Sequence, residues 1–175
     1  MKTQESTMDK DAIYALWQLL RRTTRLIYKT RQKELDKYGI SADKSSVLFT
    51  ILRQGGSATP GAIARELFLE YHSVSEQLFR MEKDGLIRRL RETDGRSRVR
   101  VLLTKKGYSA YQKSARRKSI GKVFSVLSEE ERKELWSMLA KLRETTMKQL
   151  KMETTSIYPP SREEELLESV VNMND

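Results

Sequence analysis

The sequence lacks cysteine and contains a single histidine, His72. Without thiols there is no disulfide, no thiolate nucleophile and no cysteine-ligated zinc or iron–sulfur site, and one imidazole cannot build a histidine-rich metal site. We therefore expect a protein with no catalytic residues, no metal and no cofactor. We interpret His72 as an exposed or helix-capping residue rather than a general base.

Long apolar runs are missing as well. The longest uninterrupted ones span only a few residues, and the first twelve residues show no basic segment followed by an apolar one. A secretory signal needs that order, and a membrane-spanning helix needs about 20 apolar residues. We expect a soluble, cytoplasmic protein with no membrane partner.

Basic residues outnumber acidic residues in the sequence. The 175 residues suffice for one ordinary domain, and 34 basic against 24 acidic residues give a net charge of +10. Residues 152–175 hold six acidic residues and one basic residue, so residues 1–151 alone carry +15. Such a balance favours a polyanionic partner.

A long amphipathic helix is predicted from residue 11 to about residue 38. It would be about 37 Å long at 1.5 Å per residue, longer than a domain of this size can bury against itself. We expect it to pack on a partner chain. Its apolar positions recur at helical spacing: Ile13, Leu16, Trp17, Leu20, Ile27 and Leu35.

Two short helices across a tight turn follow. The long helix ends at Gly39. Ser41 is the N-cap of the next helix, which stops at Gly55 and Gly56. Thr59-Pro60 is typical of a capped helix start. Residues 68–71 separate this helix from another, which carries Val74, Leu78 and Met81 inward and ends at Asp84-Gly85. The pattern predicts a helix-turn-helix.

After Gly85 the apolar period changes from 3.6 to 2. Residues 86–91 and 98–102 read as a hairpin with Asp94-Gly95 at its tip. In the second strand Val99, Val101 and Leu103 share one face, which leaves Arg98 and Arg100 on the other. This hairpin is a candidate wing.

Helical patterns return after the hairpin. Residues 104–122 are predicted as helical, broken by Gly107 and Gly121. Ser128 and Glu131 form a capping box for a last helix that runs to about residue 151, and residues 161–171 are a small acidic helix candidate.

The basic residues gather after the predicted recognition helix. Segment 80–106 holds ten basic and four acidic residues, a net charge of +6. A recognition helix contacts bases from its N-terminal part, so we expect DNA contacts from an outward set: His72, Ser73, Ser75, Glu76 and Arg80, with Arg96 and Arg98 from the wing.

Each type of side chain suits a different contact. The Ser73 and Ser75 hydroxyls allow close approach, Arg80 reaches phosphate, and Glu76 accepts from a cytosine amino group. For Arg96 at the wing tip two roles stand side by side: entry into the minor groove, and a turn residue paired with Asp94, which would orient the tip for that contact. Phe79 is unusual on this face: we interpret it as packing under the wing, with contact to a thymine methyl as the alternative.

The segments 62–67 (AIAREL), 73–75 (SVS), 80–89 (RMEKDGLIRR) and 94–107 (DGRSRVRVLLTKKG) stand in this order among the predicted elements. The series resembles the MarR family of bacterial and archaeal transcriptional regulators over roughly residues 11–150. The resemblance implies a mainly α fold with a small β wing, a winged helix-turn-helix with N- and C-terminal dimerisation helices. It implies the ranges 1–40 for the N-terminal dimerisation helix, 41–104 for the winged region, 105–151 for the C-terminal dimerisation helices and 152–175 for an acidic tail.

The resemblance also implies a function. A homodimer would read a pseudo-palindromic operator in double-stranded DNA, with half-sites about 10 bp apart. Many such regulators are repressors released by small phenolic or anionic ligands bound between the dimerisation helices and the winged domain. Without cysteine the peroxide-sensing branch does not apply, and one histidine argues against the zinc-sensing branch, so the effector is a small molecule or none.

This chain departs from the family pattern at four positions. Phe68 and Glu70 replace the usual glycine and serine cap of the turn, Glu76 stands where a basic residue is common, and Phe79 where a polar one is. The operator sequence therefore does not carry over. Two other functions compete with a specific repressor: a non-specific or architectural nucleic-acid binder, favoured by the charge of +15, and a winged-helix protein-interaction module, favoured by Glu76, Phe79 and the acidic tail.

Overall fold

The computed structural model describes residues 10–92 and 98–152 and is mainly helical. Helices α1 (Lys10–Leu35), η1 (Asp36–Tyr38), α2 (Ala42–Arg53), α3 (Pro60–Leu67) and α4 (Tyr71–Lys83) precede the hairpin. Helices α5 (Lys105–Ser114), α6 (Lys118–Phe124) and α7 (Glu129–Gln149) follow it. The strands are β1 (Ser57–Ala58), β2 (Ile87–Glu92) and β3 (Arg98–Leu103). The long first helix, the helix-turn-helix and the hairpin are confirmed, with a turn one residue shorter than predicted because Tyr71 already belongs to α4.

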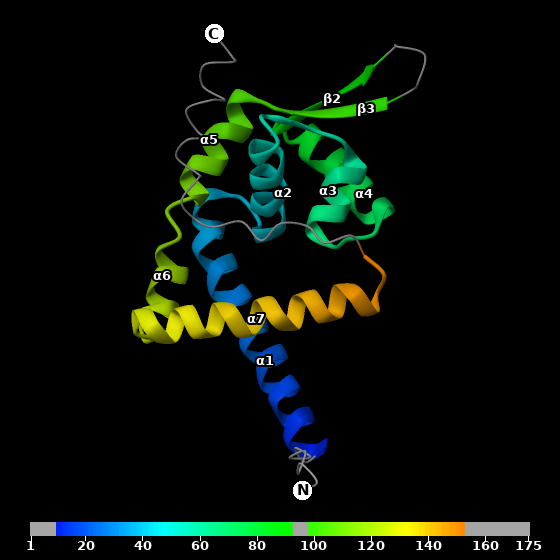
Figure 1. The fold of residues 1–175 in the computed structure, drawn as a ribbon. Helices are drawn as coiled ribbons and strands as arrows, with labels where there is room; N and C mark the ends of the chain where they lie inside the picture. The colour runs from blue at the N-terminus through cyan, green and yellow to red at the C-terminus, as the bar shows by residue number, and fades with distance from the viewer. Residues whose placement is uncertain (1–9, 93–97, 153–175) are drawn as a thin grey trace, which may run out of the picture.

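The hydrophobic core lies in the winged unit formed by α2 to α5 and the sheet (Figure 1). Its fully buried side chains come from every one of these elements, among them Leu48, Ile63, Leu78, Val101 and Tyr111. Side chains of Ser41 and Thr59 accept hydrogen bonds from Lys44 N and Ala62 N, which fixes the starts of α2 and α3. The caps and the apolar periods thus agree with the packing.

The sheet has one strand more than the sequence predicts. Strand order is β1-β3-β2, all antiparallel, with Ser57 opposite Leu102 and Ala58 opposite Val101. The β2–β3 register pairs Arg89 with Val101. Because β1 has only two residues, it cannot display a period of two, and the sequence pattern misses it.

Gly107 and Gly121 do not break the helices in which they lie, so that prediction is wrong. Gly107 lies inside α5 and Gly121 inside α6. The break comes instead at residues 115–117, where Arg117 adopts a left-handed conformation with φ of 45°. A Cβ on Gly107 would come within 1.9 Å of the Leu86 carbonyl oxygen, so glycine is needed there for close packing.

Helices α1 and α7 reach beyond the core. Of α1 only Leu35 is buried, and of α7 only Met147. Figure 1 shows the N-terminal half of α1 extending away from the winged unit. Both helices leave large apolar side chains exposed, which we call the apolar arms: Ile13, Tyr14, Leu16, Trp17, Leu19, Leu20, Trp136, Met138, Leu139 and Leu142.

None of the helices in the two described ranges is long and apolar enough to cross a bilayer. Nor do three potential metal-ligating side chains come together anywhere in those ranges. The predicted hairpin tip at Asp94-Gly95 and the acidic helix candidate 161–171 lie outside the described residues.

Candidate DNA-binding surface and neighbouring pocket

Helix α4 is held against the core by one face. Val74, Leu78 and Met81 are fully buried. The turn before it is closed by Leu69 N donating to Ala64 O over 3.0 Å, with Phe68 in a left-handed conformation at φ of 55°. Glu70 occupies the N-cap position without a side-chain hydrogen bond. The opposite face of α4 is therefore fixed in direction and turned to solvent.

That opposite face carries a stripe that we call the α4 stripe: His72, Glu76, Phe79 and Lys83. The spacings of four, three and four residues place these side chains along one line of a helix, and all four are exposed. Ser73 and Arg80 are exposed beside the line, whereas Ser75 is half-buried. Five of the seven residues predicted from the sequence thus lie on one helix.

Glu76 and Arg80 pair with each other. Arg80 Nη2 donates to Glu76 Oε2 over 3.1 Å, and both side chains are 69% exposed. An exposed pair one helical turn apart contributes little to stability, so a phosphate can replace Glu76 as the partner of Arg80. The acidic residue on this face is therefore compatible with a phosphate-binding arginine.

The wing strands add positive charge next to α4. Arg88, Arg91 and Arg100 are exposed. Arg89 is held by Glu82 of α4: its backbone N–H and its Nε each donate to the carboxylate over 2.7 Å. The Arg89 hydrogen bonds outweigh the effect of burial and lower the pKa of Glu82. This pair fixes the base of the wing to the recognition helix. Arg96 and the side chain of Arg98 lie outside the described residues.

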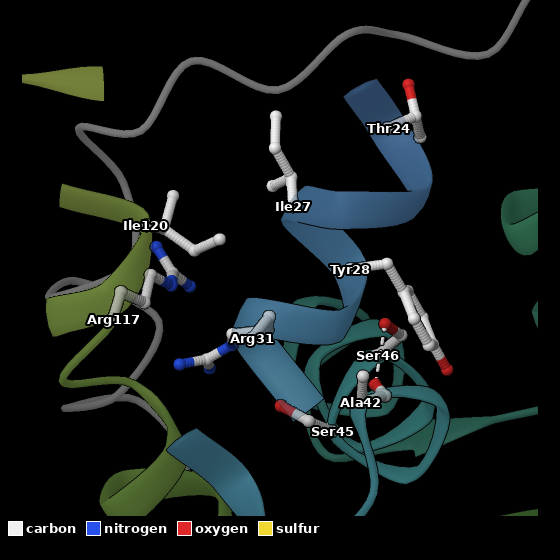
Figure 2. A pocket seen from close by; sticks show the side chains of 9 residues that line it. All are labelled: Thr24, Ile27, Tyr28, Arg31, Ala42, Ser45, Ser46, Arg117 and Ile120. Carbon is white, nitrogen blue, oxygen red and sulfur yellow. Dashed lines mark hydrogen bonds between the residues drawn. The ribbon is translucent and has the colours of Figure 1, made fainter. Parts of the chain in front are cut away.

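A pocket of about 360 Å³ opens between α1, α2 and α6 (Figure 2). Two guanidinium groups, Arg31 and Arg117, line it together with Tyr28, and no carboxylate from residues 10–92 or 98–152 does. Arg117 donates to the Tyr111 hydroxyl over 3.4 Å and lies 5.8 Å from the centre of the Phe49 ring. Burial and the hydrogen bond to Asp43 raise the pKa of Tyr28 to about 12, so its phenol stays neutral. The remaining lining residues are Thr24, Ile27, Ala42, Ser45, Ser46 and Ile120.

Glu34 ties α1 to the start of α6, next to this pocket. Its carboxylate accepts from Lys118 N over 2.9 Å, from Ser119 N over 3.1 Å and from the Ser119 hydroxyl, and it pairs with Arg31 over 2.9 Å. It thereby caps α6, whose own N-cap residue makes no side-chain cap. Burial opposes the charged form, but the Ser119 and Arg31 hydrogen bonds outweigh it and lower the pKa of Glu34 from 4.5 to about 2.

The depressed pKa of Glu34 predicts a pH-dependent contribution to stability. A carboxyl whose pKa falls on folding stabilises the native state above its unfolded pKa of 4.5 and loses that contribution as the pH falls towards 2. Glu34→Gln should lower the free energy of unfolding at pH 7 by up to about 3 kcal/mol, at 1.36 kcal/mol per pKa unit. Urea melts from pH 7 to pH 3 should show the gap to the natural protein narrowing below pH 4.5.

The matched control for Glu34 is Glu144→Gln, which removes an exposed pairing with Lys148 on α7. Because exposed pairs contribute little, this variant should unfold almost like the natural protein at pH 7. A Glu34→Gln gap that stays constant between pH 7 and pH 3 would show that the carboxylate charge does not stabilise α6.

Comparison with known proteins shows what this chain is similar to. A profile of the MarR family matches residues 38–97. The chain is similar to the HTH-type transcriptional regulator PecS of Dickeya dadantii, at 27% identity over 127 residues that cover 70% of this chain and 76% of PecS. It is also similar to the organohalide-sensing transcriptional regulator RdhR-CbdbA1625 in its 2,4-dichlorophenol-bound form, at 26% identity and a TM-score of 0.78, covering 91% of this chain and 98% of that one. By all three comparisons the chain is similar to MarR-family regulators.

A further solved structure shares the fold of this chain. It is a mutant of MarR from E. coli complexed with operator DNA, with 20% identity, a TM-score of 0.70, and coverage of 77% of this chain and 99% of that one. This likeness concerns the fold alone. The winged helix-turn-helix expected from the sequence is confirmed.

Two features of the structure near α1 escape sequence reasoning. The pocket joins α1 to Arg117, 86 positions after Arg31, and Glu34 caps a helix that begins 84 positions later. No local pattern marks either contact. The left-handed Arg117 gives no signal in the sequence because glycine, not arginine, is the residue that usually adopts that conformation.

Proposed function

We propose that this chain is a homodimeric, sequence-specific DNA-binding transcriptional repressor that a small effector releases from its operator. The observation that carries the proposal is the α4 stripe, held outward beside a basic two-stranded wing. A major groove about 12 Å wide admits one helix, and a wing on the same side meets the adjacent backbone. The match of residues 38–97 to the MarR-family profile and the similarity to PecS support the same function.

Within this proposal each predicted residue has a place. The exposed His72, Ser73 and Glu76 face base edges at the start and middle of α4, and Arg80 binds phosphate after leaving Glu76. Ser75, half-buried, contacts DNA through its hydroxyl at the edge of this surface. Arg96 and Arg98 serve the wing contact to the neighbouring groove and backbone.

Selection of bound fragments from random duplex tests the function directly. The purified protein should enrich a pseudo-palindrome with half-sites about 10 bp apart and bind it at least ~10³-fold more tightly than a scrambled duplex at physiological salt. Binding should weaken with salt by a log–log slope of roughly −0.9 for each phosphate contacted. Equal affinity for both duplexes would favour an architectural binder, and no binding at low salt would favour a protein-interaction module.

The apolar arms support a homodimer. A helix with a large apolar face needs a partner surface, and α1 and α7 find little of one among the residues that the structure describes. A second copy presents the same apolar arms, so a twofold arrangement covers both at once. Two α4 helices related by that axis match a palindromic operator.

We infer that the pocket between α1, α2 and α6 holds an anionic aromatic effector. The Arg117 guanidinium favours negative charge, Arg31 beside it is paired with Glu34, and Ile27, Tyr28 and Ile120 offer apolar surface for a ring. The relative RdhR-CbdbA1625 has a structure with 2,4-dichlorophenol bound. Helix α1 carries part of the apolar arms, and α2 belongs to the winged unit. A ligand bound between these two helices shifts the population of orientations of the winged unit and so weakens DNA binding.

Arg117 provides the test of this effector site. The probe pair 2,4-dichlorobenzoate and 2,4-dichlorophenol shares one ring and differs in the acidic group. We expect titration calorimetry to show tighter binding of the benzoate, and Arg117→Met to weaken it by roughly tenfold to a hundredfold, the range for hydrogen bonds to charged groups. Arg116→Met, an exposed neighbour outside the pocket lining, should bind as the natural protein does. Equal affinity in both variants would contradict the site.

A further inference from the structure

Phe79 is an aromatic residue in the middle of an otherwise polar stripe. It stands one helical turn after Glu76 and one before Lys83 on the outer line of α4, and its side chain is 48% exposed. The expected packing under the wing therefore holds only in part, because nearly half of the side chain remains in contact with solvent. An apolar group exposed on a surface that otherwise suits DNA needs a contact of its own chemistry.

Two cations hold the Phe79 ring from the sides of α4 and β2. Lys83 Nζ lies 4.5 Å and Arg89 Cζ 5.6 Å from the ring centre. Arg89 is itself fixed by Glu82 through hydrogen bonds of 2.7 Å from its backbone and its side chain. Cation–π attraction thus restrains the ring, so that its exposed part keeps a defined place beside positive charge.

Major-groove chemistry decides what such a ring can contact. All four bases present hydrogen-bond donors or acceptors there, and a phenyl ring cannot serve as their partner. Thymine alone presents an apolar group, its C5 methyl. The flanking Lys83 and Arg89 bring positive charge towards the phosphates of the strand that carries this base.

We infer that Phe79 is a specificity-determining residue that selects thymine at one position of each operator half-site by contact with the C5 methyl. The inference rests on the proposed DNA-binding function and adds to it a base preference at one operator position. It also explains why an apolar residue at this position is compatible with an outward recognition surface.

Replacement of thymine by deoxyuridine in the selected operator isolates the methyl group. The exchange deletes one methyl and keeps every hydrogen-bonding group of the base. Burial of one CH₂-sized group corresponds to roughly a fourfold change in affinity, so we expect about that loss per half-site at one thymine position and little at the others. Phe79→Ala should bind the thymine and deoxyuridine duplexes equally.

Two further variants separate the ring from its surroundings. Phe79→Leu keeps an apolar contact and should keep part of the discrimination, whereas Arg88→Gln, at an exposed arginine of β2, should weaken both duplexes by the same factor. Thermal unfolding checks that each variant is folded, which the exposure of both side chains favours.

The outcomes divide clearly. If the natural protein binds the selected operator but is indifferent to deoxyuridine at every position, or if Phe79→Ala keeps the full discrimination, the inference is wrong and DNA binding stands. If no specific operator emerges from the selection, the proposed function fails and the inference fails with it.

Discussion

Gly107→Ala should lower the free energy of unfolding by about 3 kcal/mol or more, the upper range for overpacking in a core. A Cβ at this position would lie 1.9 Å from the carbonyl oxygen of Leu86 and 2.9 Å from its carbonyl carbon. Both atoms are backbone, so relief requires the chain itself to move. A urea melt at pH 7 should show a lower midpoint, and the variant should bind operator less tightly because its wing is displaced.

The contact matters because several hydrogen bonds converge on it. The Thr104 hydroxyl donates to the carbonyl oxygens of Gly85 and Leu86, over 2.7 and 3.0 Å, and accepts from Gly107 N over 3.0 Å. This junction joins the end of α4 to the start of α5 at the base of the wing. Pushing α5 away from Leu86 weakens all three bonds together.

Gly121→Ala is the matched control. Gly121 lies within α6, and a Cβ there would meet no atom within 4 Å. The same exchange should raise stability by about 0.5–1 kcal/mol, because alanine favours a helix more than glycine does. If the two variants unfold alike, the close packing at Gly107 does not exist.

These two glycines show what the sequence can and cannot predict about the fold. Helix starts at Thr59 and Ser128 depend on bonds between residues at most three positions apart, so their signals are local and the structure confirms both. Gly107 depends on Leu86, 21 positions earlier, and a glycine within a helical pattern reads as a break when that neighbour is unknown. Local patterns therefore predict where helices begin better than how they pack.

The candidate DNA-binding surface likewise has features that local spacing predicts and features that depend on the packing of distant segments. The outward position of Glu76 and Phe79 follows from the helical period once Val74 and Leu78 are assigned to the core. The pairing of Arg80 with Glu76 is also a matter of local spacing. The cations around Phe79 come partly from β2, whose Arg89 lies beside the ring and is hydrogen-bonded to Glu82. That arrangement depends on how the wing packs on α4, which no single segment encodes.

Trp17→Glu should abolish most of the dimer and with it most of the operator affinity. Trp17 is 52% exposed within one chain, and its neighbours Ile13 and Leu20 continue the same face of α1. In the proposed dimer this side chain is buried against the second copy, where tryptophan contributes strongly to binding and an unpaired carboxylate is costly. We expect the dimer dissociation constant to rise at least about 100-fold, or about 2.8 kcal/mol, in sedimentation equilibrium.

Measurements of DNA binding distinguish loss of the dimer from damage to the winged unit. Affinity for the full palindrome should fall by roughly 10²–10⁴, the gain that linkage of two binding modules provides, while affinity for a single half-site stays the same. Arg22→Gln makes the same change of one unit in net charge on the polar side of α1 and should affect neither measurement. If Trp17→Glu remains a dimer with unchanged affinity, the apolar arms are not the interface. If its half-site affinity falls as well, α1 supports the winged unit directly, because the core around Leu35 would then depend on the outer half of the same helix.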